Sequence, residues 1–161
     1  MRVKRMMLLG RTGSGKTFLI QALRGEELSH GKTLAVAYGG AFEDTPGEYI
    51  ENRRLHPAPM ATSSKCDVVA LVQDASMANR IYPPQCAGMF NRKVIGIVAK
   101  VDCGDARIQR AETFLRWAGV EEISHAAQWK RSDWRPSAHT WRRRLRAWNK
   151  TVCFQTIQRG A

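Results

Sequence analysis

The sequence lacks any apolar run that approaches the ~20 residues needed to cross a membrane as a helix. An apolar segment follows the basic residues of the first five positions, but it stops at Gly10 and is too short for a secretory signal. We therefore expect a cytoplasmic protein without a membrane partner. Internal repeats and low-complexity linkers are also absent, and 161 residues suit one domain with a sizeable core.

Sequence patterns for disulfide frameworks and zinc sites are missing as well. No two of the four cysteines are close enough for a C-x-x-C pair, and the four histidines show no ligand spacing such as H-E-x-x-H. Reduced and largely structural cysteines are therefore the favoured interpretation. These residues are Cys66, Cys86, Cys103, Cys153, His30, His56, His125 and His139.

Acidic residues are few: 14 Asp and Glu stand against 26 Lys and Arg, for a formal net charge of +12. The imbalance is greatest in residues 124–161, which hold nine basic residues and a single acidic one, Asp133. The strongly basic character therefore belongs to the C-terminal segment.

What is present near the N-terminus is a complete phosphate-binding loop pattern, G-x-x-x-x-G-K-[ST]. It follows the mostly apolar residues 3–9, as expected after a buried strand, and residues 18–24 have apolar side chains at helical spacing. Strand, glycine-rich loop and helix is the context that this motif requires. The loop reads Gly10, Arg11, Thr12, Gly13, Ser14, Gly15, Lys16 and Thr17.

Each residue type in this loop has a chemical reason. The glycines let the backbone turn tightly, so that main-chain N–H groups form an anion nest, and the following helix adds partial positive charge. We assign all eight loop residues to nucleotide binding, with Lys16 on the β- and γ-phosphates and the Thr17 hydroxyl on Mg²⁺. For Arg11 a solvated side chain is the favoured interpretation, with added positive charge as the alternative.

A second candidate element, D-x-x-G, follows about thirty residues later. Residues 34–38 and 41–43 are expected to be short strands joined by a hairpin turn at Gly39 and Gly40. The second strand leads into Asp44, which is expected to approach Mg²⁺, and then Gly47, whose N–H can bond the γ-phosphate. An ordinary Asp-Thr-Pro-Gly turn is the alternative. We assign Lys16, Asp44 and Gly47 as catalytic residues.

The remaining pattern predicts an α/β fold. Residues 67–72 and 93–99 are continuous apolar runs, typical of parallel strands that are buried on both faces. Apolar residues at helical spacing predict a helix over residues 108–118, capped by Gly119, and residues 120–124 are expected to form a last strand. Strands alternating with helices give three layers around a mostly parallel sheet, with one antiparallel edge strand from the hairpin.

The order of the phosphate loop, D-x-x-G and the segment Lys100-Val101-Asp102 resembles that of P-loop NTPases of the small Ras-like GTPase type. Three segments, Lys32-Thr33, residues 44–53 and residues 94–98, resemble the EutP/PduV family of ethanolamine- and propanediol-utilisation proteins more narrowly. The resemblance covers residues 1 to about 123, and residues 44–49 are quite specific. It implies a GTPase-like fold, GTP or ATP binding and a role beside a bacterial microcompartment. Ethanolamine-branch members are also described as acetate kinases.

The resemblance also implies roles for three further residues. Thr33 lies where a switch threonine would reach Mg²⁺ and the γ-phosphate, and a polar loop residue is the alternative. Asp102 would accept the guanine N–H donors while the stem of Lys100 lies on the base, and a strand-end turn is the alternative.

The sequence departs from the common GTPase pattern at two motif positions. Ala99 replaces the Asn that usually precedes Lys100, which removes a set of loop-tethering hydrogen bonds and weakens the expectation of strict guanine selectivity. Glu48 replaces a water-orienting Gln, and a carboxylate cannot donate a hydrogen bond to the γ-phosphate. We therefore expect either slow intrinsic hydrolysis or an acceptor other than water.

Residues 124–161 show an abrupt change of composition, with four of the five tryptophans and the run Arg142-Arg143-Arg144. Two interpretations stay open: a reading-frame change that replaced the native ending, and a divergent closing helix capped at Ser137 with one apolar face. Arginine runs with tryptophan also occur in nucleic-acid-binding segments, but a solvated basic helix is favoured, so nucleic acid is not an expected partner.

Three functions are consistent with these residues. The first is a Mg²⁺-dependent nucleoside triphosphatase, the second a phosphotransferase with acetate as acceptor, and the third a nucleotide-binding scaffold that docks to microcompartment shell or enzyme proteins with little turnover. Lys16, Thr17 and Asp44 favour the first two, whereas Glu48 and the altered C-terminal segment favour the third.

Overall fold

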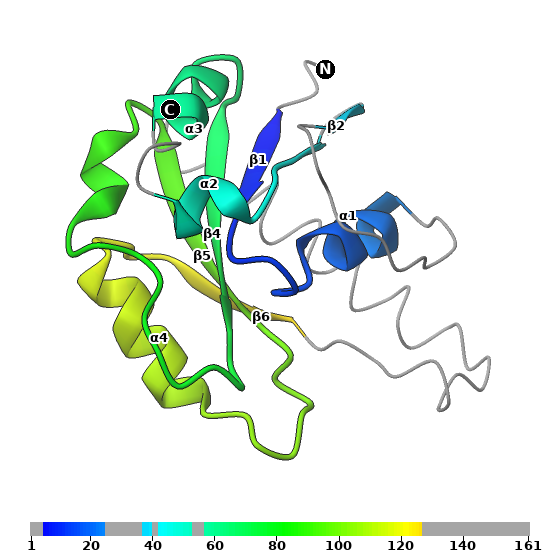
Figure 1. Cartoon of the computed structure of the whole chain (residues 1–161), viewed down its shortest axis with the longest axis vertical. Coiled ribbons are helices and arrows are strands. Elements are labelled where there is room, and N and C mark those ends of the chain that lie inside the picture. The colour runs from blue at the N-terminus through cyan, green and yellow to red at the C-terminus, as the bar shows by residue number, and fades with distance from the viewer. Residues whose placement is uncertain (1–4, 25–36, 40–41, 53–56, 127–161) are drawn as a thin grey trace.

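The computed structural model of the chain describes residues 5–24, 37–39, 42–52 and 57–126. They form a six-stranded sheet with helices on both faces (Figure 1). The elements are β1 (Met6–Leu9), α1 (Lys16–Arg24), β2 (Ala37–Gly39), β3 (Phe42–Asp44), α2 (Glu48–Glu51), α3 (Pro57–Ser63), β4 (Val68–Asp74), the 3-10 helix η2 (Cys86–Met89), β5 (Lys93–Ala99), α4 (Ile108–Trp117) and β6 (Ile123–Ala126). The predicted α/β class with a parallel sheet is confirmed.

The strand order is β2-β3-β1-β4-β5-β6. β1 pairs in parallel with β3 and β4, and β5 pairs in parallel with β4 and β6. β2 runs antiparallel to β3, with Ala37 opposite Asp44. The carboxyl ends of the five parallel strands therefore meet at one edge of the sheet.

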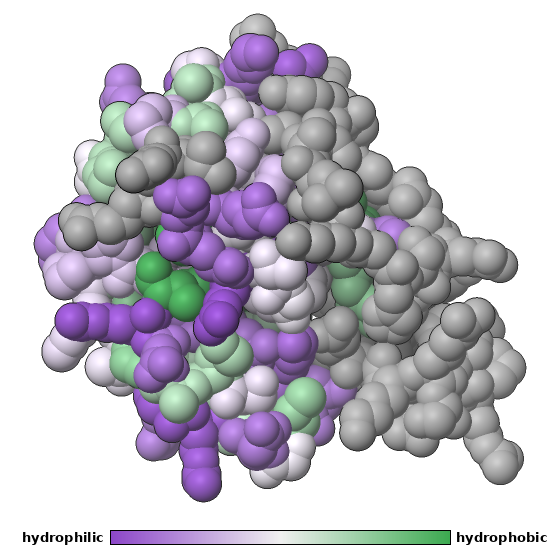
Figure 2. Space-filling view, in the orientation of Figure 1, coloured by the Kyte–Doolittle hydropathy of each residue, from purple (hydrophilic) through white to green (hydrophobic). Residues whose placement is uncertain are grey.

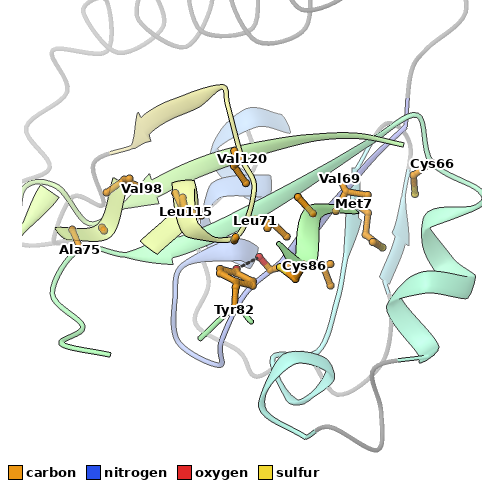
Figure 3. Close-up of a cluster of buried hydrophobic side chains, with 14 residues drawn as sticks. Met7, Cys66, Val69, Leu71, Ala75, Tyr82, Cys86, Val98, Leu115 and Val120 are labelled. Atoms are coloured by element: carbon orange, nitrogen blue, oxygen red, sulfur yellow. Dashed lines mark hydrogen bonds between the residues drawn. The ribbon is translucent and has the colours of Figure 1, made fainter. Parts of the chain in front are cut away.

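Two cores lie on the two faces of the sheet, as the alternation of side chains along each strand requires. Met6 and Leu8 belong to the cluster on the α1 face, with Leu19 and Ile20 of that helix. The opposite cluster joins Met7 and Leu9 to residues of η2 and α4, including Leu115 (Figure 3). β4 is buried along its whole length, and its residues from Val68 to Val72 accordingly form a continuous apolar run without alternation.

The predicted helix over residues 108–118 is α4, and its end is set by Gly119, whose φ of +90° is readily adopted by glycine. The last strand begins at Ile123, three residues later than its predicted start. Val120 is buried in the core on the α4 face and lies in the loop that precedes this strand.

Two short helices, α2 and α3, were not part of the sequence prediction. α2 has only four residues, too few to show a helical period, and α3 contains Pro57 and Pro59 near its start. Proline is tolerated in the first turn of a helix because the N–H groups there lack intrahelical partners.

In the view of Figure 2 the described surface is mainly hydrophilic, with scattered hydrophobic side chains. Among the described residues, no helix is both long and apolar enough to cross a membrane. The predicted turn residue Gly40, the switch candidate Thr33 and the basic segment beyond residue 126 lie outside the described residues. The first three residues of the segment that begins at position 124 pair with β5 as part of β6.

Candidate functional site

The candidate residues gather at the carboxyl edge of the parallel sheet. The phosphate loop follows β1, Asp44 ends β3, and Lys100 follows β5. This edge is where open α/β sheets hold their ligands, because the strand ends and the following loops form a crevice there. The parallel pairing thus brings together motifs that lie up to ninety residues apart in the sequence.

The phosphate loop has the expected strand–loop–helix context, since β1 ends at Leu9 and α1 begins at Lys16. Gly13 and Gly15 have φ values of +77° and +94°, a backbone region that residues with a Cβ rarely adopt. The turn is closed by a hydrogen bond from Ser14 N to the Arg11 carbonyl over 3.1 Å. The backbone conformation of the loop therefore favours glycine at positions 13 and 15.

Lys16 is 5% exposed, and its Nζ donates hydrogen bonds to the Gly10 and Arg11 carbonyls over 2.8 and 2.9 Å. Burial lowers the pKa of Lys16 to about 8, and the nearby charges of Asp44 and Glu51 oppose that shift. A phosphate beside Nζ would favour the charged form in the same way.

Thr17 and Asp44, both assigned to Mg²⁺ from the sequence, lie side by side. Thr17 Oγ1 donates to Asp44 Oδ2 over 2.5 Å, and Asp44 is 5% exposed. A hydroxyl and a carboxylate are hard oxygen ligands of the kind that Mg²⁺ prefers, so this pair fits a magnesium ion. No group of three or more His, Cys, Asp or Glu in the described part of the chain forms a metal site by itself.

The Asp-Thr-Pro-Gly segment packs directly against the phosphate loop. The buried Thr45 hydroxyl donates to the Leu8 carbonyl of β1 over 2.5 Å. A Cβ on Gly47 would lie 2.1 Å from the main-chain nitrogen of Thr12, so only glycine permits this approach. Gly47 thus lies beside the phosphate loop, and Glu48, which follows it, is exposed at the start of α2.

Glu51 connects the same two segments through its side chain. Its Oε1 accepts a hydrogen bond from Thr12 N over 2.8 Å and lies 3.6 Å from Arg11 Nε. Arg11 thus has an acidic neighbour, and its side chain remains 45% exposed.

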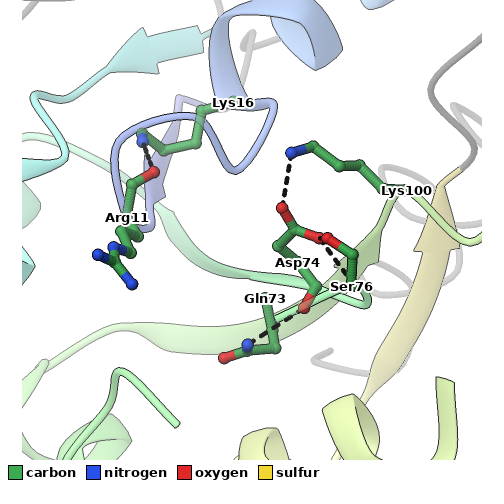
Figure 4. A network of polar contacts seen from close by, with 6 residues as sticks. All are labelled: Arg11, Lys16, Gln73, Asp74, Ser76 and Lys100. Atoms are coloured by element: carbon green, nitrogen blue, oxygen red, sulfur yellow. Dashed lines mark hydrogen bonds and ion pairs between the residues drawn. The ribbon is translucent and has the colours of Figure 1, made fainter. Parts of the chain in front are cut away.

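The loop after β5 carries the two residues assigned to the base. Lys100 has a φ of +59° and its Nζ lies 2.6 Å from Asp74 Oδ2 at the end of β4 (Figure 4). Asp74 Oδ1 accepts two further bonds, from Ser76 N and Ser76 Oγ. Asp102 lies two residues beyond Lys100 with an exposed side chain.

Three residues of this region were not singled out from the sequence. The Tyr82 hydroxyl lies 2.9 Å from both the Leu9 and Val72 carbonyl oxygens and so joins β1 to β4 directly before the phosphate loop. Burial raises the pKa of Tyr82 well above its ordinary value, which keeps the hydroxyl a donor. Asp74 and Glu51 were also missed, although Asp74, like Asp44, directly ends a strand.

Similarity to known proteins places this chain in a family. The sequence profile of the PduV-EutP family, described as ethanolamine utilisation - propanediol utilisation, matches residues 3–133. The chain belongs to this family. The predicted resemblance to EutP and PduV is thereby confirmed.

Two relatives illustrate the branches of the ethanolamine utilisation - propanediol utilisation family. The propanediol utilization protein PduV of Citrobacter freundii is 41% identical over 122 residues, which cover 75% of this chain and 81% of that protein. The probable acetate kinase EutP of Escherichia coli (strain K12) is 31% identical over 125 residues, covering 74% and 77%.

Solved structures support the fold of this family member. Aquifex aeolicus Era bound to GDP.AlF4- matches with a TM-score of 0.56 at 18% identity, and a bacterial selenocysteine-specific elongation factor with 0.57 at 19%. The matches cover 78% and 79% of this chain, but only 52% of the Era chain and 26% of the elongation factor chain. These likenesses show a GTPase-type fold.

Proposed function

We propose that this chain binds a purine nucleoside triphosphate with Mg²⁺ and cleaves or transfers its γ-phosphate in ethanolamine or propanediol utilisation. The observation that supports this is the convergence of two motifs on one loop. Lys16 is buried within the phosphate loop, Thr17 and Asp44 are hydrogen-bonded to each other, and Gly47 packs against Thr12.

In this proposal catalysis is positioning and electrostatics. The loop N–H groups and Lys16 neutralise charge on the transferred phosphoryl group. Two of the three Lys16 donors bond the carbonyls of Gly10 and Arg11, so within the described part of the chain one remains for a phosphate oxygen. Mg²⁺, held by Thr17 and Asp44, would supply further positive charge.

Calorimetric titration with GTP, GDP, ATP and ADP, each with Mg²⁺, tests the proposal. Lys16→Ala should weaken triphosphate binding about tenfold to hundredfold, since a charge-assisted hydrogen bond contributes roughly 1.5–3 kcal/mol. Lys93→Ala, at the exposed start of β5, is the matched control. Unchanged affinity in folded Lys16→Ala, or no binding of any nucleotide by the unaltered chain, contradicts the proposal.

We further propose that Asp102 reads the base. Asp102→Asn should shift preference from guanine toward xanthine, because the amide presents a donor where xanthine offers a carbonyl. The same four-nucleotide titration, extended to XTP, measures this shift. If the unaltered chain prefers ATP and the variant behaves identically, Asp102 does not contact the base.

A second candidate is acetate phosphorylation, favoured by the 31% identical relative named a probable acetate kinase. An acetate oxygen would attack the γ-phosphorus, the bond from that phosphorus to the β–γ bridging oxygen would break, and the products would be acetyl phosphate and the nucleoside diphosphate. Trapping acetyl phosphate as its hydroxamate detects this reaction. Diphosphate release without hydroxamate would assign the acceptor role to water.

A third candidate is a nucleotide-dependent scaffold in the cytoplasm beside a bacterial microcompartment. It is favoured by Glu48, an exposed carboxylate in the position of a water-orienting amide. Binding without measurable hydrolysis or acetyl phosphate formation would support this function. Co-sedimentation with purified microcompartments, with and without nucleotide, would test docking to their shell or enzyme proteins.

A further inference from the structure

The end of β5 lacks a side chain that can tether the loop after it. Ala99 is 5% exposed and has only a methyl group, where the common base-recognition motif has Asn. The structure places another polar side chain beside this position. Asp74 and Ala99 are register partners in the parallel β4–β5 pair.

Asp74 is 5% exposed, and both of its carboxylate oxygens are hydrogen-bonded. Oδ1 accepts from Ser76 N over 2.9 Å and from Ser76 Oγ over 2.6 Å, which fixes the carboxylate on its own turn. Oδ2 accepts from Lys100 Nζ over 2.6 Å. The carboxylate is therefore oriented by Ser76 in the turn after β4 and ion-paired with Lys100 in the loop after β5.

Main-chain hydrogen bonds hold the turn after β4 in position. Ala75 N donates to the Ala99 carbonyl over 2.9 Å, and Arg107 N donates to the Ala75 carbonyl over 2.8 Å. The turn after β4 is thus bonded both to the end of β5 and to the residue before α4. Lys100 itself has a left-handed φ of +59°, a backbone conformation that surrounding contacts must hold for a non-glycine residue.

The Lys100–Asp74 pair is shielded from solvent, with side-chain exposures of 23% and 7%. Screening by water and salt is weaker for such a pair than at the surface, and a buried carboxylate without its partner is costly. The pair therefore restricts the Lys100 side chain to one region. Figure 4 shows that side chain extending from the end of β5 toward Asp74.

We infer that Asp74 is a positioning residue for the purine base: it holds Lys100 so that the aliphatic stem of that lysine presents a fixed surface to the base, in place of the tether missing at Ala99. This inference rests on the proposed nucleotide binding at the same edge of the sheet. Asp74 acts through Lys100 and does not touch the phosphates.

The test compares affinities for GTP, ATP, CTP and UTP, each with Mg²⁺, in the full chain. Asp74→Asn should weaken the preferred purine nucleotide about tenfold, while the pyrimidine nucleotides change less than about twofold, since the phosphate loop is untouched. Glu122→Gln is the matched control, because it removes a Lys–Glu pair of 2.7 Å at the other end of β5. That control should leave the purine-to-pyrimidine ratio unchanged.

Two further variants separate positioning from general stability. Ser76→Ala, a milder change, should lower the purine preference in the same direction. In a Lys100→Met background, Asp74→Asn should have no further effect on the ratio, because Asp74 acts through Lys100. Equal weakening of all four nucleotides, an unchanged ratio in Asp74→Asn, or full additivity with Lys100→Met would overturn the inference. If the unaltered chain bound no nucleotide, the proposed function would fail and this inference with it.

Discussion

The main-chain N–H of Thr12 donates a hydrogen bond to the Glu51 carboxylate over 2.8 Å, so a side chain from α2 is bonded to the phosphate loop. The same carboxylate lies near Arg11 and helps to keep Lys16 charged. Glu51 thus holds two motifs together and also places a negative charge close to the candidate phosphate site. These two effects have opposite consequences for an anionic ligand.

Glu51→Gln should tighten triphosphate binding about threefold to tenfold, because an amide oxygen can still accept from Thr12 while the repulsive charge is removed. Titration calorimetry with Mg²⁺ and the preferred nucleotide measures the change. Glu121→Gln, exposed before β6, provides the control. Weaker binding in Glu51→Gln would show that loop ordering by the charge outweighs repulsion.

Gly47→Ala should destabilise the fold and weaken triphosphate binding. Its Cβ would overlap the Thr12 main chain, and overpacking of this kind typically costs about 1–3 kcal/mol. Gly88→Ala is the matched control, because nothing lies within 4 Å of a Cβ there and its φ is not positive. Urea unfolding gives the free energy of unfolding of both variants. Equal values would mean that the Gly47 segment and the phosphate loop can move apart without loss of stability.

Triphosphate binding should become pH-dependent above pH 8. The pKa of Lys16 is about 8 in the nucleotide-free protein because of burial, and a bound phosphate should raise it. Binding at pH 9 should therefore take up about one proton, and affinity should fall up to roughly tenfold per pH unit above pH 8. Calorimetry in buffers of different ionisation enthalpy measures the proton count. Equal proton uptake at pH 7 and pH 9 would show that Lys16 does not change its protonation state when the nucleotide binds.

Glu48→Gln should increase nucleotide hydrolysis if water is the natural acceptor, because the amide can both accept from water and donate to the γ-phosphate. Phosphate release under single-turnover conditions is the measurement. Glu112→Gln, on α4 away from the loop, is the control. A rate that stays at the unaltered value would favour acetate as acceptor or a scaffold without turnover.

The sequence by itself determined the class of the fold and the identity of the phosphate loop. The spacing of Gly10, Gly15, Lys16 and Thr17 suffices to identify the loop because the motif is local. Its glycines and the helix that follows are contiguous in the sequence. Strands β4 and β5 were predictable for a related reason, since burial on both faces leaves continuous apolar runs. The resemblance to the EutP/PduV family likewise depended on short contiguous blocks.

Only the tertiary structure decided which side chains support these motifs. Glu51 reaches Thr12 across 39 positions, and Tyr82 reaches Leu9 across 73. Asp74 meets Lys100 because β4 and β5 pair in a particular register, and neither residue's sequence neighbourhood specifies that pairing. Such contacts arise from strand order and packing, so a local pattern can place a motif on the chain but cannot show which distant side chain holds it in position.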